Sequence, residues 1–239
     1  MEQMKVIQTR NLSKIYNEGK GNEVRAVNGI SLAIERGEFT AIVGPSGSGK
    51  TTLLNIIGGL DNTNSGEVLI EGTDIGKLRE NELINFRLNN IGFVFQSYNL
   101  IPVLNAKENV GFIMLLQHIP EKEINERVEA LLRSVGLENQ MLKRPNQMSG
   151  GQQQRIAVAR ALASKPKFIL ADEPTANLDS KSTSDLLDIM ENLNKEEGIT
   201  FIFSTHDQRV IDRAHRIVNI EDGKIISDTG QEVLNTPTK

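Results

Sequence analysis

The sequence predicts an α/β fold with a parallel sheet, and three observations support this. The apolar run Phe39–Val43 leads into the glycine-rich stretch Gly44-Pro-Ser-Gly-Ser-Gly49, and a segment with helical spacing, 51–57, follows. A second run, 168–171, is apolar without alternation, which is typical of a central strand buried on both faces. Between the two, 105–149 has the apolar spacing of helices. Strand, glycine loop and helix in this order open a nucleotide-binding α/β unit.

The composition limits the function classes. Hydrophobic residues make up 38% and charged residues 24% of the 239, which is typical of a soluble globular protein. The net charge of −4 argues against a dedicated duplex-DNA binder, because such domains have a basic surface. With no cysteine, the chain has no disulfides, cysteine-bound zinc or thiol nucleophiles. We find neither the ~20 apolar residues of a membrane span nor an apolar signal segment, and expect a cytoplasmic protein whose membrane role depends on a partner.

The N-terminal part of the chain predicts short strands. Val6-Ile7 lies in one, and apolar residues alternate across 24–34 on either side of Asn28-Gly29. A turn at 17–22 separates the two regions. Two further apolar runs, 68–70 and 91–95, predict strands.

The middle of the chain predicts a mostly helical insertion in the α/β core. Asn105 and Glu108 have the spacing of a capping box where the insertion begins. Apolar residues then recur three and four positions apart at Ile124, Val128, Leu131, Leu132 and Val135.

After the insertion the α/β pattern returns. A helix is expected through Leu186, Leu187, Met190 and Leu193, and a strand at 199–204. An antiparallel pair is expected around the turn Asp222-Gly223, and the residues from Thr229 onward are polar.

The stretch from Gly44 to Thr51 fits the phosphate-binding pattern G-x-x-x-x-G-K-[ST]. Its glycines let backbone N–H groups converge on phosphate oxygens at a helix N-terminus. In such a loop Lys50 reaches the β- and γ-phosphates and the Thr51 hydroxyl binds Mg²⁺. The alternative is a plain glycine-rich turn, which the strand before it and the helix after it disfavour.

Two carboxylates, Asp172 and Glu173, end the predicted strand 168–171. Beside a phosphate loop, Asp172 is expected to help hold Mg²⁺ through its water shell, and Glu173 to accept a proton from an attacking water. Without the loop, a helix cap or a solvated turn explains them equally well. His206 follows the strand 199–204, and by its position alone it could be a plain exposed histidine.

The segment Ser149-Gly-Gly-Gln152 opens an amphipathic helix. Ser149 and Gln152 stand at capping-box spacing, so a well-made helix cap is the simpler explanation. A second anion site is the alternative, because two glycines expose the amides of the helix N-terminus. Taken alone, Gln96 could be a surface amide, and Tyr16 an aromatic residue of an edge strand.

In this order, the motifs resemble those of the ATP-binding subunit of an ABC (ATP-binding cassette) transporter over essentially the whole chain. Tyr16 is similar to the aromatic residue that stacks on adenine, 44–51 to the Walker A loop, and Gln96 to the Q-loop glutamine. Met148-Ser-Gly-Gly-Gln152 resembles the signature motif, with Met in place of the usual Leu. The remaining similarities are 168–172 to Walker B, Glu173 to the catalytic glutamate, 176–179 to the D-loop and His206 to the switch histidine.

The resemblance implies a P-loop NTPase core of ABC type, with an antiparallel β subdomain and a helical subdomain insertion. It implies one ABC ATPase domain over 1–239: a β subdomain and core at 1–95 and 165–229, the Q-loop and helical subdomain at 96–164, and a polar tail at 230–239. The catalytic residues it implies are Glu173, His206 and Gln96. The metal ligands are Thr51, Gln96 and Asp172. The ATP-binding residues are Tyr16, Gly44, Pro45, Ser46, Gly47, Ser48, Gly49, Lys50, Thr51, Thr52, Ser149, Gly150, Gly151, Gln152 and Asp179.

The implied cofactors are ATP and Mg²⁺, and the implied partners are a second copy of the chain and an integral membrane subunit. Two ATP molecules are then held between head-to-tail subunits. The ATP bound by one subunit contacts the signature motif of the opposite subunit. The chain would lie on the inner face of the membrane through its partner, and no nucleic acid is expected. The segments 53–61, 65–68 and 91–102 resemble the LolD and MacB branch, which is associated with lipoprotein release and with macrolide or peptide export.

Three other functions are less compatible with the sequence. Cassette ATPases of DNA repair carry a long coiled coil or zinc modules, for which the spacing from Gln96 to Ser149 and the lack of cysteine leave no place. Translation-associated cassette proteins carry two cassettes, whereas this chain has one Walker A loop and one signature motif. A non-enzymatic nucleotide switch would be expected to lack Glu173.

Overall fold

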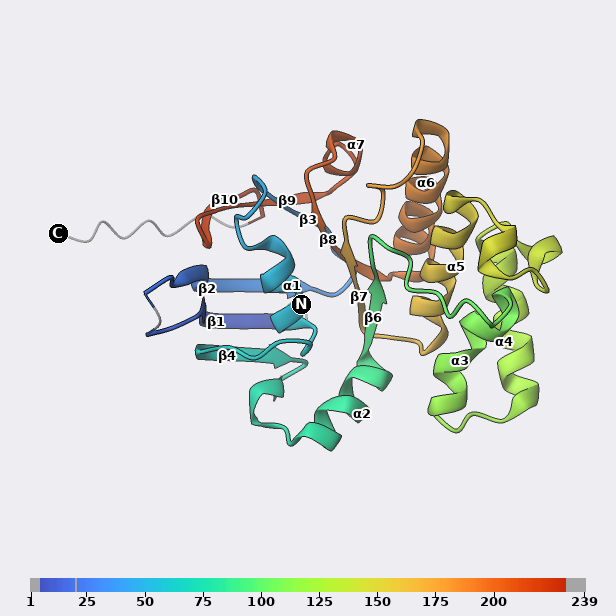
Figure 1. The fold of residues 1–239 in the computed structure, drawn as a ribbon, viewed down its shortest axis with the longest axis horizontal. Helices are drawn as coiled ribbons and strands as arrows, with labels where there is room; N and C mark the ends of the chain where they lie inside the picture. The colour runs from blue at the N-terminus through green and yellow to red at the C-terminus, as the bar shows by residue number, and fades with distance from the viewer. Residues whose placement is uncertain (1–4, 20, 231–239) are drawn as a thin grey trace.

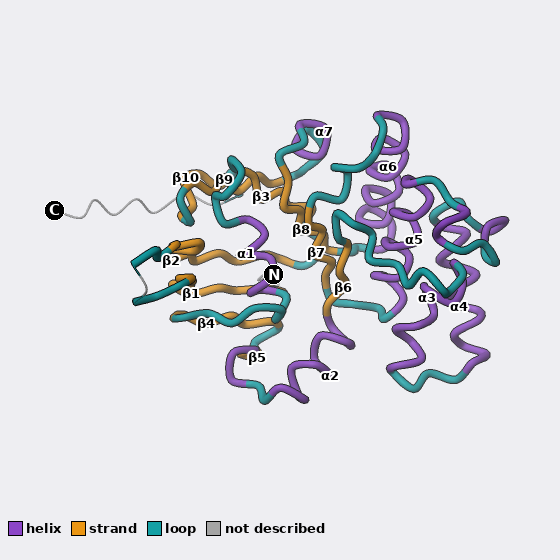
Figure 2. The backbone as a smooth tube through the Cα atoms, viewed as in Figure 1, coloured by secondary structure: helices purple, strands orange, loops and turns teal. Residues whose placement is uncertain are grey.

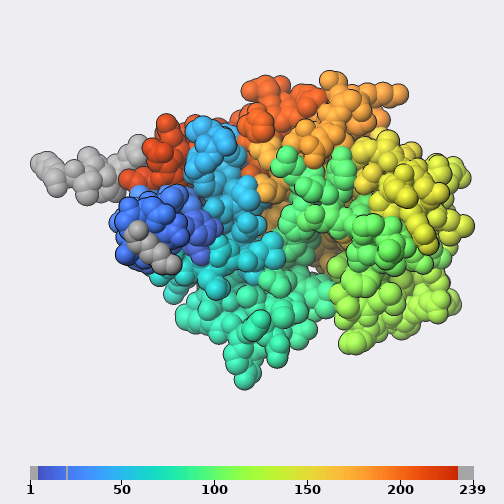
Figure 3. Space-filling view, in the orientation of Figure 1, coloured from blue at the N-terminus to red at the C-terminus, as the bar shows by residue number. Residues whose placement is uncertain are grey.

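The computed structural model describes residues 5–19 and 21–230, and its helices and strands form two sheets and a helical end (Figures 1 and 2). The antiparallel sheet lies at one end of the view and the helices within residues 106–197 at the other, with the strands at 91–94, 168–172 and 200–205 between them (Figure 1). The space-filling view shows these two ends as parts of one continuous surface (Figure 3).

The six-stranded sheet has the order β10-β9-β3-β8-β7-β6. Neighbouring strands are parallel except for β9 and β10, which form a hairpin. The strands are β3 (Phe39–Val43), β6 (Ile91–Val94), β7 (Phe168–Asp172), β8 (Thr200–Thr205), β9 (Arg216–Glu221) and β10 (Lys224–Asp228). The predicted parallel sheet, the buried strand at 168–171 and the hairpin at Asp222-Gly223 are therefore confirmed.

The four-stranded antiparallel sheet has the order β2-β1-β4-β5. Its strands are β1 (Lys5–Tyr16), β2 (Val24–Glu35), β4 (Ser65–Ile70) and β5 (Thr73–Asp74). The prediction of short strands was wrong, because Asn28-Gly29 does not interrupt β2. Leu12 pairs with Ile30 and Ser13 with Asn28, which leaves Gly29 as the extra residue of a bulge. Its φ of +74° is open to glycine, and the bulge lets two twelve-residue strands stay paired.

The predicted helices are present as α1 (Lys50–Ile57), α3 (Ala106–Leu116), α4 (Glu121–Ser134), α5 (Gly150–Ala163) and α6 (Ser180–Glu197). Both capping boxes are formed, one by Asn105 and Glu108 at α3, the other by Ser149 and Gln152 at α5. The sequence analysis gave no helix at α2 (Glu80–Asn90) or α7 (Gln208–Ile211). Because α2 buries no residue, it has no apolar stripe to reveal it. Within the described ranges, no helix has the length and apolar character to cross a bilayer.

Helix α1 is packed between the two sheets. It contacts β2 on one side and β7 and β8 on the other. Leu53, Leu54, Ile56 and Ile57 are buried in one apolar cluster with residues of both sheets. The loop before α1 is thereby fixed to the most buried part of the molecule.

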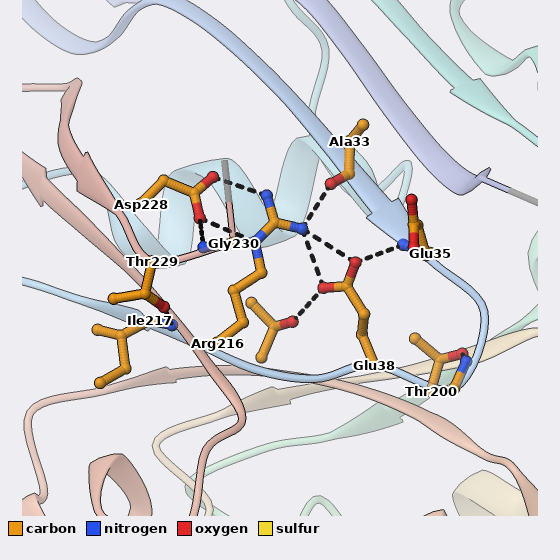
Figure 4. Close-up of polar contacts among 11 residues, drawn as sticks. Ala33, Glu35, Glu38, Thr200, Arg216, Ile217, Asp228, Thr229 and Gly230 are labelled. Carbon is orange, nitrogen blue, oxygen red and sulfur yellow. Dashed lines mark hydrogen bonds and ion pairs between the residues drawn. The ribbon is translucent and has the colours of Figure 1, made fainter. Parts of the chain in front are cut away.

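A buried arginine ties the two sheets together near the described end of the chain (Figure 4). Arg216 of β9 pairs through two nitrogens with Asp228 of β10, at 2.9 and 2.6 Å. It also donates to the Ala33 carbonyl of β2 at 2.8 Å and to both Glu38 carboxylate oxygens at 3.0 Å. Burial alone would raise the pKa of Asp228, but the hydrogen bonds from Arg216 outweigh it and lower that pKa. Of the predicted polar tail at 230–239, only Gly230 lies within the described residues.

Candidate functional site

A cavity of about 610 Å³ opens beside the N-terminus of α1. The lining residues come from the antiparallel sheet, from the glycine loop and α1, and from the loops that follow β6, β7 and β8, and most belong to the predicted site. The lining is Tyr16, Val24, Ala26, Ser46, Gly47, Gly49, Lys50, Thr51, Thr52, Gln96, Glu173 and His206.

The loop 44–49 requires glycine at two positions for lack of space. A Cβ on Gly44 would lie 2.0 Å from the Ile220 carbonyl oxygen, and one on Gly49 would lie 1.9 Å from the Ala26 carbonyl oxygen. Both residues also have positive φ, at +153° and +101°. The backbone of the loop is therefore pressed against β9 and β2.

Two polar side chains, one in the loop and one at the start of α1, are available to contact a bound anion. Lys50 is 7% exposed, and its ammonium donates to the carbonyls of Gly44 and Pro45, at 2.9 and 3.0 Å. The hydroxyl of Ser48 is buried and, among the described residues, has no hydrogen-bond partner. A buried hydroxyl left without a partner costs free energy, which a ligand oxygen would recover.

Two of the three magnesium ligands predicted from the sequence, Thr51 and Asp172, lie together, and the third, Gln96, lines the same cavity as Thr51. The Thr51 hydroxyl at the start of α1 donates to Asp172 Oδ1 at the end of β7, at 3.0 Å. Within 5–19 and 21–230 the chain has no cluster of three or more acidic or histidine side chains that could hold a metal by itself. Mg²⁺ is commonly held by one or two protein oxygens together with substrate phosphates, and Thr51 with Asp172 fits that pattern.

Glu173 and His206 form a contact at the carboxyl ends of β7 and β8. Glu173 Oε1 and His206 Nδ1 are 2.7 Å apart, and the Thr205 hydroxyl donates to Glu173 Oε2 at 3.4 Å. Glu173 has a φ of +46°, which is uncommon for a residue with a side chain. Such a conformation persists only where the surroundings impose it, and here its N–H is held by the Ser204 carbonyl at 2.8 Å.

Asp207 belongs to this neighbourhood, and the sequence analysis missed it. Its carboxylate accepts from the Thr175 hydroxyl at 2.7 Å and from Arg209, and its N–H donates to the Thr205 hydroxyl at 3.0 Å. Hydrogen bonds from Arg209 and Thr175 lower the pKa of Asp207 to about 2, against the effect of burial. Asp207 thereby joins the loop after Glu173 to the loop of His206. Its position as N-cap of α7, directly after the histidine, was the available signal.

The loop after β6 is held through its backbone carbonyls. Asn177 donates to the Gln96 carbonyl at 3.0 Å, and Gln154 of α5 to the Phe95 carbonyl at 3.4 Å. The guanidinium of Arg160, also on α5, donates to the carbonyls of Tyr98, at 2.9 Å, and Asn99. The Gln96 side chain is left exposed at the cavity. Helix α5, which Ser149 caps, thus helps to fix the loop that carries Gln96.

The remaining predicted site residues lie outside the cavity. Among the described residues lining it, none comes from Ser149–Gln152, where the Ser149 hydroxyl accepts from Gln152 N–H at 3.3 Å as a helix cap. Asp179 caps α6 by accepting from Ser182 N–H at 2.9 Å, a bond that lowers the pKa of the aspartate. Ser149 and Asp179 are exposed, as the N-caps of helices of 14 and 18 residues, whereas Gly151 is buried.

Comparisons with known proteins agree with these motifs. A model of the ABC transporter family matches residues 27–176. The lipoprotein-releasing system ATP-binding protein LolD 1 of Rhodopseudomonas palustris is 47% identical over 221 residues, which is 92% of this chain and 98% of that protein. The macrolide export ATP-binding/permease protein MacB of Aggregatibacter actinomycetemcomitans is 44% identical over 99% of this chain but only 36% of its own length.

Among solved structures, a dimer of the ATP-binding cassette MJ0796 bound to ADP and phosphate has a TM-score of 0.85. It is 42% identical, and the match covers 93% of this chain and 97% of that one. ATP with Mg²⁺, which this family uses, suits the glycine loop, the buried Lys50 and the Thr51–Asp172 pair. The chain belongs to the ABC transporter family, as one of its ATP-hydrolysing cassettes.

Proposed function

We propose that this chain powers a separate membrane subunit by binding and hydrolysing Mg-ATP between two copies of itself. In each copy Lys50 and the loop amides hold the phosphates, and Thr51, Asp172 and Gln96 take Mg²⁺. Glu173 accepts the proton of the attacking water, and His206 contacts the γ-phosphate. Bound Mg²⁺ would supply positive charge against the phosphates.

The observation that carries the proposal is the separation of two anion-binding features. Residues of the phosphate loop line the cavity, whereas Ser149 is exposed and neither it nor Gly150 or Gly151 is among the described residues that line the cavity. A helix N-terminus attracts anions. Here the N-terminus of α5 does not line the cavity, so a nucleotide bound in the same subunit would not reach it. A head-to-tail dimer joins the two features, and the dimeric MJ0796 structure supports that arrangement.

The domain boundaries belong to the same proposal. The helical subdomain is 96–164, between the core segments 1–95 and 165–229. The loop carrying Gln96 joins the subdomain to the core, and the helices α3 to α5 follow it.

The contact with the membrane subunit is proposed near Gln96 and the segment 98–104, whose apolar residues differ in exposure. Leu100 is half-buried and packs against the core, so it is given a packing role and not a docking role. Val103 is 71% exposed. Exposure of a large apolar side chain is unfavourable unless a partner covers it. The chain would lie on the inner face of the membrane through this contact.

The process served is proposed to be lipoprotein release or the export of a macrolide or peptide. The support is the similarity to LolD and MacB over nearly the whole chain. The first of these relatives is a separate ATP-binding protein of almost the same length, which favours a partner encoded apart from this chain.

Two inactive variants test the composite site. Lys50→Ala breaks the phosphate loop, and Ser149→Ala breaks the signature motif, and each alone is expected to lose about 10²-fold or more in ATP hydrolysis. In an equal mixture, a mixed dimer keeps one site made of an intact loop and an intact signature motif. We expect up to about one quarter of the unaltered rate to return, because half of the dimers are mixed and half of their sites are intact.

A capping role alone predicts a different result. Ser149→Ala would then cost about 1 kcal/mol of stability and leave hydrolysis and dimerisation otherwise intact. Asn105→Ala is the matched control, since it removes the same kind of cap from α3. If mixing restores no activity, the signature motif does not act across subunits.

A further inference from the structure

Three side chains form a polar group at the edge of the cavity. The Tyr16 hydroxyl, at the end of β1, donates to Asp61 Oδ2 at 2.6 Å. The ammonium of Lys14 donates to Asp61 Oδ1 and to the Asn62 carbonyl, both at 2.6 Å. Asp61 Oδ2 therefore accepts from Tyr16, and Oδ1 accepts from Lys14 of the same strand and from the N–H of Asn62, at 2.7 Å.

The group leaves one side of the Tyr16 ring available. The Lys14 ammonium lies over the ring, 5.0 Å from its centroid, a geometry in which a cation is attracted to the aromatic face. Among the described residues that line the cavity, Tyr16 is present and Lys14 is not. The Lys14 side chain is only 12% exposed, so the ammonium is committed to this pairing rather than to solvent.

The pKa values agree with the geometry. Burial and the hydrogen bond to Asp61 raise the pKa of Tyr16, which stays a neutral donor. Burial alone would raise the pKa of Asp61, but hydrogen bonds from Lys14 and Tyr16 outweigh it and lower that pKa.

Asp61 also connects Tyr16 to the phosphate loop. It follows α1, which begins at Lys50, and its N–H donates to the Asn55 carbonyl of that helix at 3.3 Å. Tyr16 stands on the antiparallel sheet, whereas the phosphate loop stands on the core. A fixed bond from the ring to the end of α1 sets the distance between a base stacked on Tyr16 and the phosphates held at the other end of the helix.

We propose that Asp61 is a positioning residue that holds Tyr16 in the orientation needed to stack on the base of the nucleotide, with Lys14 fixing the other carboxylate oxygen. The inference rests on the proposed function, since it takes the cavity as the ATP site. A side chain ordered before binding spares the ligand the cost of ordering it. A plain surface pairing would instead stabilise the sheet and leave nucleotide affinity unchanged.

A double-mutant cycle tests the proposal. Tyr16→Phe keeps the ring and removes the hydroxyl, and Asp61→Asn removes the charge that holds it. Each is expected to weaken Mg-ATP binding by about 2- to 10-fold, the cost of ordering one side chain on binding. Both changes act on the Tyr16–Asp61 hydrogen bond. The Mg-ATP affinity of the double variant is therefore expected to lie within about 2-fold of that of the weaker-binding single variant. Effects that multiply would overturn the proposal.

Tripolyphosphate separates base positioning from damage to the phosphate loop. It occupies the loop and has no base, so its affinity is expected to be the same for all variants. Glu67→Gln is the matched control, because it removes a carboxylate that pairs with Arg10 and Lys77 in the same sheet. A loss of tripolyphosphate affinity equal to the loss for ATP would show a folding defect and overturn the proposal.

Tyrosine emission gives a direct readout. The chain has two tyrosines and no tryptophan, so in a Tyr98→Phe background Tyr16 is the sole emitter. ATP is expected to change that emission and tripolyphosphate to leave it unchanged, and Asp61→Asn should shift the ATP midpoint upward. If emission responds alike with and without Asp61, the carboxylate does not position the ring. If the unaltered chain binds neither ATP nor tripolyphosphate, the proposed function itself is wrong.

Discussion

At the scale of single residues, the site depends on side chains that hold other side chains in place. Glu173 lies in a left-handed backbone conformation with its carboxylate 2.7 Å from His206. Asp207 holds the loops on both sides through Thr175 and through the Thr205 hydroxyl. We therefore expect any effect of Asp207 on catalysis to come from the positions of Glu173 and His206, which lie on those loops.

The low pKa of Asp207 makes a prediction about stability and pH. A carboxylate whose pKa is about 2 when folded and 3.8 when unfolded stabilises the fold above pH 3.8, and the gain is lost as pH falls toward 2. At pH 7 this amounts to at most about 2 kcal/mol, reduced by the partial exposure of Arg209. Denaturant unfolding of Asp207→Asn should show a deficit at pH 7 that shrinks by about half near pH 3. A deficit independent of pH would mean that the charge of Asp207 is not what stabilises the loops.

At the scale of elements, α5 has two ends with different tasks. Its N-terminus presents the signature residues, and further along, Arg160 holds the loop that carries Gln96. Burial lowers the pKa of Arg160, and within the described ranges no carboxylate pairs with it, so the two backbone carbonyls are its main partners. Movement of α5 would therefore be transmitted to the loop.

Arg160→Met is expected to loosen that loop without unfolding the core. The loss of two hydrogen bonds from a charged group, about 1.5 to 3 kcal/mol each, should speed amide exchange across 97–104 by about tenfold or more. Hydrogen exchange followed by mass spectrometry measures this. Arg155→Met is the control on the same helix, because Arg155 pairs with Asp185 of α6 instead. Equal exchange in the two variants would rule out a specific role for Arg160.

At the scale of the whole molecule, the two ends of the fold are held to one core by different means. The sheets are joined by α1 and by the Arg216 network, whereas the helices at the helical end share an apolar cluster with β7 and β8. A force applied by a partner at the helical end can therefore reach the cavity through the loop that follows β6.

Val103→Asp tests where the partner applies that force. The side chain is 71% exposed, so the variant is expected to fold and to bind Mg-ATP as before. It should lose co-purification with the membrane subunit and the stimulation of hydrolysis by it, because a charge would be buried at the contact. Ile226→Asp is the control, on an exposed apolar residue of β10. Full coupling in Val103→Asp would move the docking site elsewhere.

Features that depend on neighbours along the chain could be predicted from the sequence alone. The glycine loop, the parallel strands and the caps at Asn105 and Ser149 follow from periodicity and from bonds that span a few residues. The order of the motifs was enough to identify the family. Helix α2 escaped because it has no buried face, and β2 was divided wrongly because a bulge at Gly29 restores its pairing.

Which distant side chains meet depends on the path of the whole chain through the fold. Thr51 reaches Asp172 across 121 positions, and Tyr16 reaches Asp61 across 45. Neither pairing has a local signal, because it depends on the crossover path that brings strand and helix ends to one edge of the sheet. Leu100 and Val103 are both apolar and three positions apart, so their sequence does not distinguish them. In the fold, Leu100 packs against the core and Val103 is exposed.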